Sequence, residues 1–479
     1  MVRSRRVVVA LVGVLALSGC PAGGSAARSA GSPSPAVSRN FQPGAPGLDD
    51  PYFPTYGNGG YDVADYALKL RYDPATDKLT GTAAITATAT ADLSRFNLDL
   101  AHLTVDSVTV DGAAARHRAE GNELSIEPAT GVPAGRKFTV TVGYGGVPKP
   151  LGSKELGEGG FLHTPDGAIA LGEPESASTW FPVNDHPTDK ATYALEITVP
   201  QGLAALSNGS PGPRSTDAGW TTWKWSEGTP MASYLATVVI GKYRVKTGTH
   251  KGKPLVTAVH ESLPASGDAE DSMARTGEIA DFLETQFGPY PFEAYGGVVV
   301  TDKRINYALE TQSRPVYGNA FFRTDPDPVV VAHELAHQWF GDSVSVRQWK
   351  DIWLNEGFAS YAEWLWEEHD GGASAQDNFD ATYAAASDWK VRTGDPGKAD
   401  LFSFAGVYKR GAMTVHALRL AVGDEAFFRI LKTWTAEKRN ANVATADFIT
   451  LAERISGKAL RPMFDDWLLS TEAPKVPGS

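Results

Sequence analysis

The chain has 479 residues, a formal net charge of −12 and a single cysteine. The acidity argues against nucleic acid as a partner and against a basic membrane-binding face. One cysteine cannot form an intramolecular disulfide, and the roughly 430 residues that follow the N-terminal segment are enough for two or three domains.

The first nineteen residues have the pattern of a secretory signal. Arg3, Arg5 and Arg6 precede an apolar stretch over 7–17, which is too short to span a bilayer. Leu17-Ser18-Gly19-Cys20 is similar to a bacterial lipobox. We therefore predict a lipoprotein signal peptide over 1–19, lipidation of Cys20, and export to the outer face of the bacterial cell membrane, where the lipid at Cys20 is the anchor. Removal of 1–19, with three arginines and no acid, would change the charge from −12 to −15.

The next segment, 20–50, is predicted to be a disordered tether. Its stretch 21–47 is rich in Ser, Gly, Pro and Ala and contains no Leu or Ile, so it cannot bury a core of its own.

Residues 51–247 are predicted to form a β-sandwich-like domain. Apolar and polar residues alternate, with the period of a half-buried strand, over 66–72, 79–88, 103–110, 138–144 and 193–199. Asp111-Gly112 predicts a tight turn after the third of these strands.

Residues 248–479 are predicted to form a mainly helical α+β domain. Helical periods cover 269–287, 329–340, 356–369, 376–389, 408–421, 424–438 and 445–455, with one strand over 297–300. The first helix should stop at Gly288-Pro289. The tryptophans of this region are interpreted as core side chains and not as a substrate platform; they are Trp339, Trp349, Trp353, Trp364 and Trp366.

Two histidines four residues apart predict a metal site. His333 and His337 lie on one face of the expected helix, since each residue turns about 100°. Glu356 is the third candidate ligand, and Glu334 can reach water without binding the metal. Two imidazoles and one carboxylate leave a coordination position open, which is typical of catalytic zinc. We expect one Zn²⁺ per chain.

The setting of this motif favours a metal site over an ordinary helix that carries two histidines. Asp327 is expected to cap the helix, with Pro328 at its first position. The apolar content that follows predicts a buried helix, as a zinc catalyst requires.

These segments resemble the M1 aminopeptidase family of gluzincin metallopeptidases. His-Glu-Leu-Ala-His-Gln-Trp-Phe-Gly-Asp (333–342) and Trp-Leu-Asn-Glu-Gly-Phe-Ala (353–359) are similar to its zinc signature. Ile-Asn-Tyr-Ala-Leu-Glu-Thr (305–311) is similar to its exopeptidase motif, and Val-Tyr-Lys-Arg-Gly-Ala (407–412) to its catalytic-tyrosine segment. Glu173 matches a Gln/Glu position ahead of 181–187. The resemblance implies a saddle-shaped N-terminal β domain followed by a thermolysin-like catalytic domain.

The same resemblance implies roles for individual residues. Glu334 would be the general base and Tyr408 the donor to the oxyanion, while Glu310 and Glu173 would bind the substrate α-ammonium. Glu175 is an alternative to Glu173, because it lies two residues on.

Further residues of the site are left open by the sequence. Tyr307 stands where the exopeptidase motif usually has Gly, which affects how closely the backbone approaches a substrate. Asp342 and Asn355 are candidate hydrogen-bond partners of the metal ligands.

We therefore expect a zinc-dependent aminopeptidase that acts on peptides. The chain ends about seventy residues after Tyr408, whereas the resemblance implies that most members of the family continue into a large helical C-terminal domain that roofs the active site, which we do not expect from this sequence. Two alternatives stay open: an endopeptidase or long-peptide hydrolase with an open active site, and a non-catalytic surface peptide-binding protein. The oligomeric state is not determined by the sequence.

Overall fold

The computed structural model describes residues 39–153 and 157–478. Contacts divide the chain into Met1–Arg39 and a compact unit, Asn40–Ser479. The predicted signal peptide and Cys20 lie outside the described residues. The last residues of the predicted tether, 20–50, belong to the folded unit and are not a tether. Here β1 (Gln42–Pro43) pairs with a neighbouring strand, and the buried Asp50 carboxylate accepts a hydrogen bond from the backbone N–H of Trp349, at 2.9 Å.

A nine-stranded sheet contains every strand that alternation predicted in 51–247. Its longest members are β2 (Tyr61–Asp73), β3 (Lys78–Ala89), β9 (Lys137–Gly146), β13 (Lys190–Pro200) and β17 (Trp220–Ala232), in the order β15-β17-β13-β2-β3-β9-β5-β6 with β16 beside β17. The short members are β5 (Thr104–Val110), β6 (Ala113–Ala114), β15 (Ser210–Pro211) and β16 (Ser215–Asp217). Asp111 (φ 50°) and Gly112 (φ 79°) form the predicted turn between β5 and β6.

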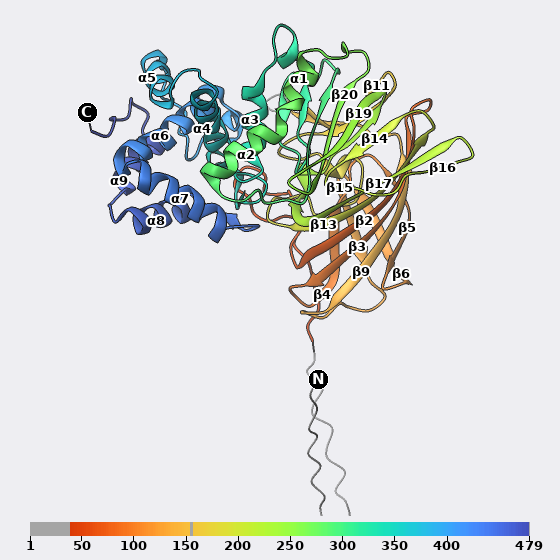
Figure 1. Cartoon of the computed structure of the whole chain (residues 1–479). Helices are drawn as coiled ribbons and strands as arrows, with labels where there is room; N and C mark the ends of the chain where they lie inside the picture. Colours follow the sequence, from red (N-terminus) through yellow and green to blue (C-terminus); the bar gives the residue numbers. More distant parts are fainter. Residues whose placement is uncertain (1–38, 154–156, 479) are drawn as a thin grey trace, which may run out of the picture. The chain divides into compact units, whose positions relative to one another are not determined.

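Two smaller sheets complete the β-rich N-terminal region (Figure 1). One contains β1, β4 (Leu93–Asp99), β8 (Glu123–Glu127) and β7 (Arg116–Glu120). The other contains β10 (Leu151–Ser153), β11 (Gly157–Thr164), β12 (Gly167–Leu171), β18 (Val238–Gly241) and β14 (Ala204–Ser207). The predicted fold class, a mostly β region followed by a helical one, is confirmed.

The second region begins with a five-stranded sheet and continues into helices. The sheet runs β19 (Tyr243–His250), β20 (Lys253–His260), β21 (Tyr295–Val300), β23 (Val316–Gly318) and β22 (Ala308–Leu309). The predicted boundary between 247 and 248 falls inside β19. A parallel pair, β24 (Ser345–Val346) and β25 (Asn442–Val443), lies among the helices.

The helices are α1 (Asp268–Ala274), α2 (Thr276–Phe287), α3 (Pro328–His337), α4 (Trp353–His369), α5 (Ala375–Ala385), α6 (Arg410–Val422), α7 (Asp424–Glu437), α8 (Thr445–Ser456) and α9 (Arg461–Leu469). Short 3₁₀ turns occur at Ala177–Thr179, Ser233–Leu235, Asn319–Phe322, Trp349–Asp351 and Lys398–Asp400. None of the described helices is long and apolar enough to cross a membrane.

Several helix predictions were wrong in detail, and the helices predicted over 329–340 and 376–389 end at His337 and Ala385. The predicted helix 269–287 is broken at Arg275, and the Thr276 hydroxyl donates to the Met273 carbonyl at this break, at 2.8 Å. The predicted helix 408–421 starts only at Arg410, after a π-helical turn over Phe404–Lys409. Helix α9 was not predicted, whereas the stop at Gly288 (φ 96°) is confirmed.

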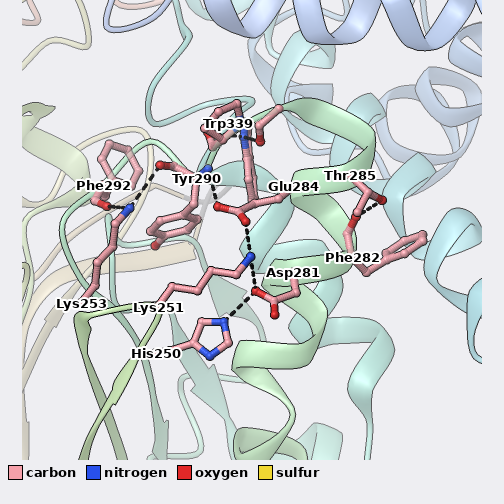
Figure 2. A network of polar contacts seen from close by, with 12 residues as sticks. His250, Lys251, Lys253, Asp281, Phe282, Glu284, Thr285, Tyr290, Phe292 and Trp339 are labelled. Carbon is pink, nitrogen blue, oxygen red and sulfur yellow. Dashed lines mark hydrogen bonds and ion pairs between the residues drawn. The ribbon is translucent and has the colours of Figure 1, made fainter.

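A polar network holds α2 against the β19–β20 hairpin and the end of α3 (Figure 2). On the hairpin, His250 and Lys251 each reach Oδ1 of Asp281 on α2, at 2.7 Å. The indole N–H of Trp339 donates to the Gly288 carbonyl at 3.0 Å. Because α3 packs against both α2 and α4, this network fixes the helix that carries the two histidines. The five tryptophans predicted as core are each at most 3% exposed, so that prediction is confirmed.

One lysine connects the β-rich region to the chain that leaves α3. Lys190 is the first residue of β13, and its Nζ donates to the backbone carbonyls of Asp342 (2.7 Å) and Ser343 (3.0 Å). Burial lowers the pKa of Lys190 to about 7, while the facing Asp342 acts in the opposite direction.

Candidate metal centre

Helix α3 is capped and buried as the sequence predicted. The Asp327 carboxylate accepts hydrogen bonds from the backbone N–H groups of Val329 and Val330, both at 3.1 Å, and Pro328 occupies the first helical position. All residues over 331–337 are buried. The helix therefore presents its polar side chains to the protein interior and to one cavity, not to bulk solvent.

The three predicted ligand atoms converge on one point. Nε2 of His333 and Nε2 of His337 lie 3.1 Å apart, and Oε2 of Glu356 lies 3.4 Å from each. Helix α4 begins at Trp353, so Glu356 is in its first turn, directly across from α3. The two predicted histidines and the predicted glutamate thus form a single buried cluster.

Each histidine is oriented by a partner on its other ring nitrogen. Nδ1 of His333 lies 2.6 Å from Oε1 of Glu363, and Nδ1 of His337 lies 3.0 Å from the Phe340 carbonyl. Partners of this kind fix the ring and direct Nε2 toward a metal. Sequence reasoning did not identify Glu363; the available signal was its position seven residues after Glu356, on the same face of one helix.

Neither of the two candidate partners named from sequence makes such a contact. The side-chain oxygens of Asp342 and both polar side-chain atoms of Asn355 are buried without a hydrogen-bond partner. The backbone N–H of Asp342 instead bonds the His337 carbonyl at 3.0 Å.

The cluster fits a zinc ion. Two imidazole nitrogens at 3.1 Å must share a proton or a cation, and Oε2 of Glu356 is buried without a hydrogen bond. Burial alone would lower the pKa of His337, but Glu310 and Glu356 raise it to about 9; conversely, burial would raise the pKa of Glu356, but the histidines lower it to about 2. The site therefore favours positive charge, and its two nitrogens and one oxygen leave a tetrahedral zinc one open position.

Glu334 lies beside this cluster without joining it. Carboxylate oxygens of Glu334 and Glu310 and a nitrogen of His337 lie within 4.8 Å of one another. Oε2 of Glu334 is buried and has no hydrogen-bond partner. Burial raises the pKa of Glu334 to about 8, with His333 and His337 acting to lower it. Burial thus makes this carboxylate more basic than a free glutamate, which is the direction that a general base requires.

Glu310 and Glu173 are brought to the same side of the centre. The buried Glu310 follows β22 and accepts a hydrogen bond from the phenol of Tyr234 at 3.2 Å, a contact not foreseen from sequence. Oε1 of Glu173 is buried without a partner, and burial, followed by repulsion from Glu310, raises the pKa of Glu173. Glu175, the alternative to Glu173, is engaged elsewhere: its Oε1 accepts from the Tyr56 phenol at 2.6 Å.

Tyr408 is carried to the centre by the π-helical turn. Its ring is parallel to the ring of His333, with 6.0 Å between centroids and 12° between planes. Gly357 on α4 and Gly411 on α6 allow the two helices to meet, since a Cβ on Gly357 would lie 2.9 Å from Cα of Gly411. This contact places the residue next to Glu356 against the segment that bears Tyr408.

All predicted site residues of the described chain line one cavity of about 400 Å³. It contains the three ligands, together with Glu334, Glu310, Glu173, Tyr408 and Tyr307. The volume is within the usual range for a small-molecule or peptide pocket. Tyr307 occupies the wall itself, where the resembled motif usually has a glycine.

Comparison with known protein families matches both regions. Residues 62–235 match the peptidase M1 N-terminal domain, and residues 272–467 match the peptidase family M1 domain. The solved structure of an M1 zinc metallopeptidase from Deinococcus radiodurans is 30% identical, with a TM-score of 0.83, over 90% of this chain and 98% of that one. A mutant of that enzyme bound to a Tyr-Ser-Ala substrate also has a TM-score of 0.83, at 29% identity over 90% of this chain and 99% of its own.

Curated relatives are similar over a smaller share of their length. Glutamyl aminopeptidase of Mus musculus is 28% identical over 329 residues, which are 64% of this chain and 34% of that protein. Aminopeptidase N of Streptomyces lividans is 26% identical over 309 residues, which are 59% of this chain and 36% of that protein. The chain thus spans about a third of the length of these two relatives.

Proposed function

This chain belongs to peptidase family M1, and on that premise we propose that it is a zinc aminopeptidase that hydrolyses the N-terminal peptide bond of peptides. The observation that carries the proposal is the buried carboxylate of Glu310, which lies within 4.8 Å of both Glu334 and His337 in one cavity. A second carboxylate beside a hydrolytic centre gives a free α-ammonium a place to bind. The relatives named as aminopeptidases and as M1 zinc metallopeptidases support the assignment.

His333, His337 and Glu356 would hold the zinc. When bound, the zinc ion supplies a Lewis acid that acidifies water and polarises a carbonyl group. Glu334 accepts the proton of the attacking water and returns it to the leaving amine. The Tyr408 phenol donates a hydrogen bond to the carbonyl oxygen as it gains negative charge.

Glu310 and Glu173 are proposed to bind the N-terminal amine of the substrate and so to fix which peptide bond lies at the metal. A peptide α-ammonium has a pKa of about 8 and is largely charged at neutral pH, so removing it from water is costly unless carboxylates replace the hydration. Glu310 is buried, Oε1 of Glu173 is buried without a partner, and repulsion from Glu310 adds to burial in raising the pKa of Glu173. A cation between them relieves this repulsion, and the first peptide bond then lies at the metal.

Substrates with and without a free amine test the proposal. The unmodified enzyme should cleave amino-acid arylamides and leave their N-acetylated counterparts largely uncut. Glu310→Ala should lower kcat/KM for free-amine substrates about 10- to 100-fold, the value of a hydrogen bond to a charged group. Glu261→Ala, an exposed acid remote from the cavity, is the matched control. Equal cleavage of acetylated and free substrates by the unmodified enzyme would instead support an endopeptidase.

We also propose that the protein is exported and held at the outer face of the cell membrane by a lipid on Cys20. The basic N-terminus, the short apolar stretch and the sequence Leu17-Ser18-Gly19-Cys20 support this. Mass spectrometry of the mature N-terminus should show acylation. Cys20→Ser should release the protein or leave it unprocessed; a Cys20→Ser protein that is processed and still bound to the membrane contradicts the proposal.

A further inference from the structure

A second cavity, of about 470 Å³, adjoins the metal cavity on the side of Glu173. The two cavities share Glu173, Tyr307, Ala308, Leu309 and Tyr408 in their walls. No metal ligand lines the second cavity. It therefore begins where the substrate α-ammonium is expected and extends away from the metal.

This position assigns the cavity to one part of a substrate. If the α-ammonium lies between Glu310 and Glu173 with the first carbonyl at the metal, the side chain of the first residue is the only group attached between them. That side chain branches from the α-carbon next to Glu173, which lies at the entrance of the second cavity. The volume accommodates a long side chain.

The charged side chains that line the cavity are all acids. Glu158, Glu173 and Glu175 line it, and among its described lining residues there is no Lys, Arg or His. Oε1 of Glu173 is buried without a hydrogen-bond partner, whereas Oε1 of Glu175 accepts from Tyr56 at 2.6 Å. Glu158 is exposed at the wall formed by β11.

We propose that this cavity binds the first side chain of the substrate and selects a cationic one, lysine or arginine. The inference rests on the proposed aminopeptidase function and adds its substrate class. The aliphatic stem of such a side chain packs against Tyr56, Leu151 and Phe402, and its charged end reaches Glu175 and Glu158. Arginine can engage a carboxylate through two parallel hydrogen bonds.

The electrostatics of the cavity agree with this ligand. Burial, then repulsion from Asp185, raises the pKa of Glu175 to about 7, and the neighbouring Lys398 only partly offsets these effects. A bound cation stabilises the ionised carboxylate and is held by it in turn. A glutamate or aspartate side chain in the same place would add a like charge to three carboxyl groups, so acidic first residues should be rejected.

Arylamides that differ only in the first side chain test this selection. Arginine and lysine are compared with norleucine, which has a similar stem without charge, and with glutamate. The ratio of kcat/KM for arginine to that for norleucine should exceed about 10 and should fall about tenfold in Glu175→Gln, as for loss of a hydrogen bond to a charged group. Glu158→Gln, at an exposed position, should lower the same ratio by a smaller factor, and Glu261→Gln is the charge-matched control.

The relative values of kcat/KM for these arylamides decide between the possible ligands of the second cavity. An arginine-to-norleucine ratio below about 10 for the unmodified enzyme, or one that Glu175→Gln and Glu158→Gln both leave unchanged, overturns the proposal while leaving the aminopeptidase function intact. Preference for phenylalanine over both arginine and norleucine would assign the cavity to aromatic side chains instead. If no free-amine arylamide is cleaved, including norleucine, it is the proposed function that fails.

Discussion

The strand pair β2–β3 and the helix pair α3–α4 differ in the side chains that they bury and in what that burial does for the protein. Along β3, buried apolar side chains such as Ile85 alternate with exposed or half-buried Thr and Ala. Along α3 and α4 the buried set includes His333, Glu334, His337 and Glu356. Apolar burial stabilises the fold directly, whereas buried ionisable groups cost stability unless they are paired or bind a cation. The buried strand residues stabilise the fold, whereas the buried ionisable residues of the two helices form the reactive site at some cost in folding free energy.

The largest expected effect is a loss of kcat on substitution of Glu334, which is buried for activity and not for stability. Glu334→Gln removes the group that accepts a proton, so kcat should fall about 10²- to 10⁴-fold. Because the charged form of Glu334 is disfavoured by burial and its Oε2 has no partner, thermal stability should be unchanged or higher. Steady-state kinetics, zinc content and a thermal melt measure the three quantities.

The control for Glu334→Gln is Glu425→Gln, an exposed acid on α7. It should leave both the rate and the melting temperature unchanged. A Glu334→Gln protein that retains full kcat would show that another group is the base.

Tyr408→Phe should lower kcat about 10²- to 10³-fold with little change in KM, since the phenol acts on charge that develops in the transition state. The ring contact with His333 is preserved in Phe, so the fold and zinc content should remain. Wild-type kcat/KM in Tyr408→Phe would exclude this phenol as the donor.

The third prediction tests the strand side of the comparison. Ile85 lies between Tyr66 on β2 and Val140 on β9 and is 1% exposed. Ile85→Ala should lower the free energy of unfolding by about 2–5 kcal/mol through the cavity that it leaves. Denaturant unfolding measures this, and kcat/KM of the folded fraction should be unchanged. Thr82→Ala, at an exposed position of the same strand, should change stability by less than about 0.5 kcal/mol.

The smallest expected effect is a loss of stability at the start of α3, the helix that carries the two histidines. Asp327→Ala removes the side-chain acceptor for the backbone N–H groups of Val329 and Val330. The cost should be about 0.5–2 kcal/mol of stability. Asp327→Asn keeps an acceptor at the same place and should recover most of that loss. Equal destabilisation by both substitutions would show that the charge of Asp327, and not its capping bond, is what matters.

The parts of this molecule that residue pattern alone predicted are those set locally, whereas Glu310, Glu173 and Tyr408 were predicted through the family resemblance. Alternation located the strands of the nine-stranded sheet, and spacing along one helix brought His333 and His337 together. The cap at Asp327 and the turn at Asp111-Gly112 depend on neighbouring residues only. Each of these features is determined within about ten residues of chain.

The parts that were missed depend on contacts between distant segments. Tyr234 reaches Glu310 across 76 positions of sequence, and Tyr56 reaches Glu175 across 119. No local pattern marks such pairs, because each partner is an ordinary residue in its own segment. The π-helical turn before α6 was missed for a related reason, since its place is set by how α6 packs on α4.

Lys190 has a consequence for how the protein unfolds. Its Nζ holds two carbonyls just beyond the zinc helix, although the residue belongs to a strand of the β-rich region. Detaching the two regions would leave those carbonyls without this donor and would let the chain after α3 relax, so neither region can melt far ahead of the other. The hydrogen bonds from Trp349 to Asp50 and from Tyr234 to Glu310 join the same two regions. Scanning calorimetry of the intact chain should therefore record one heat-absorption peak, and Lys190→Met should move that peak to lower temperature without dividing it.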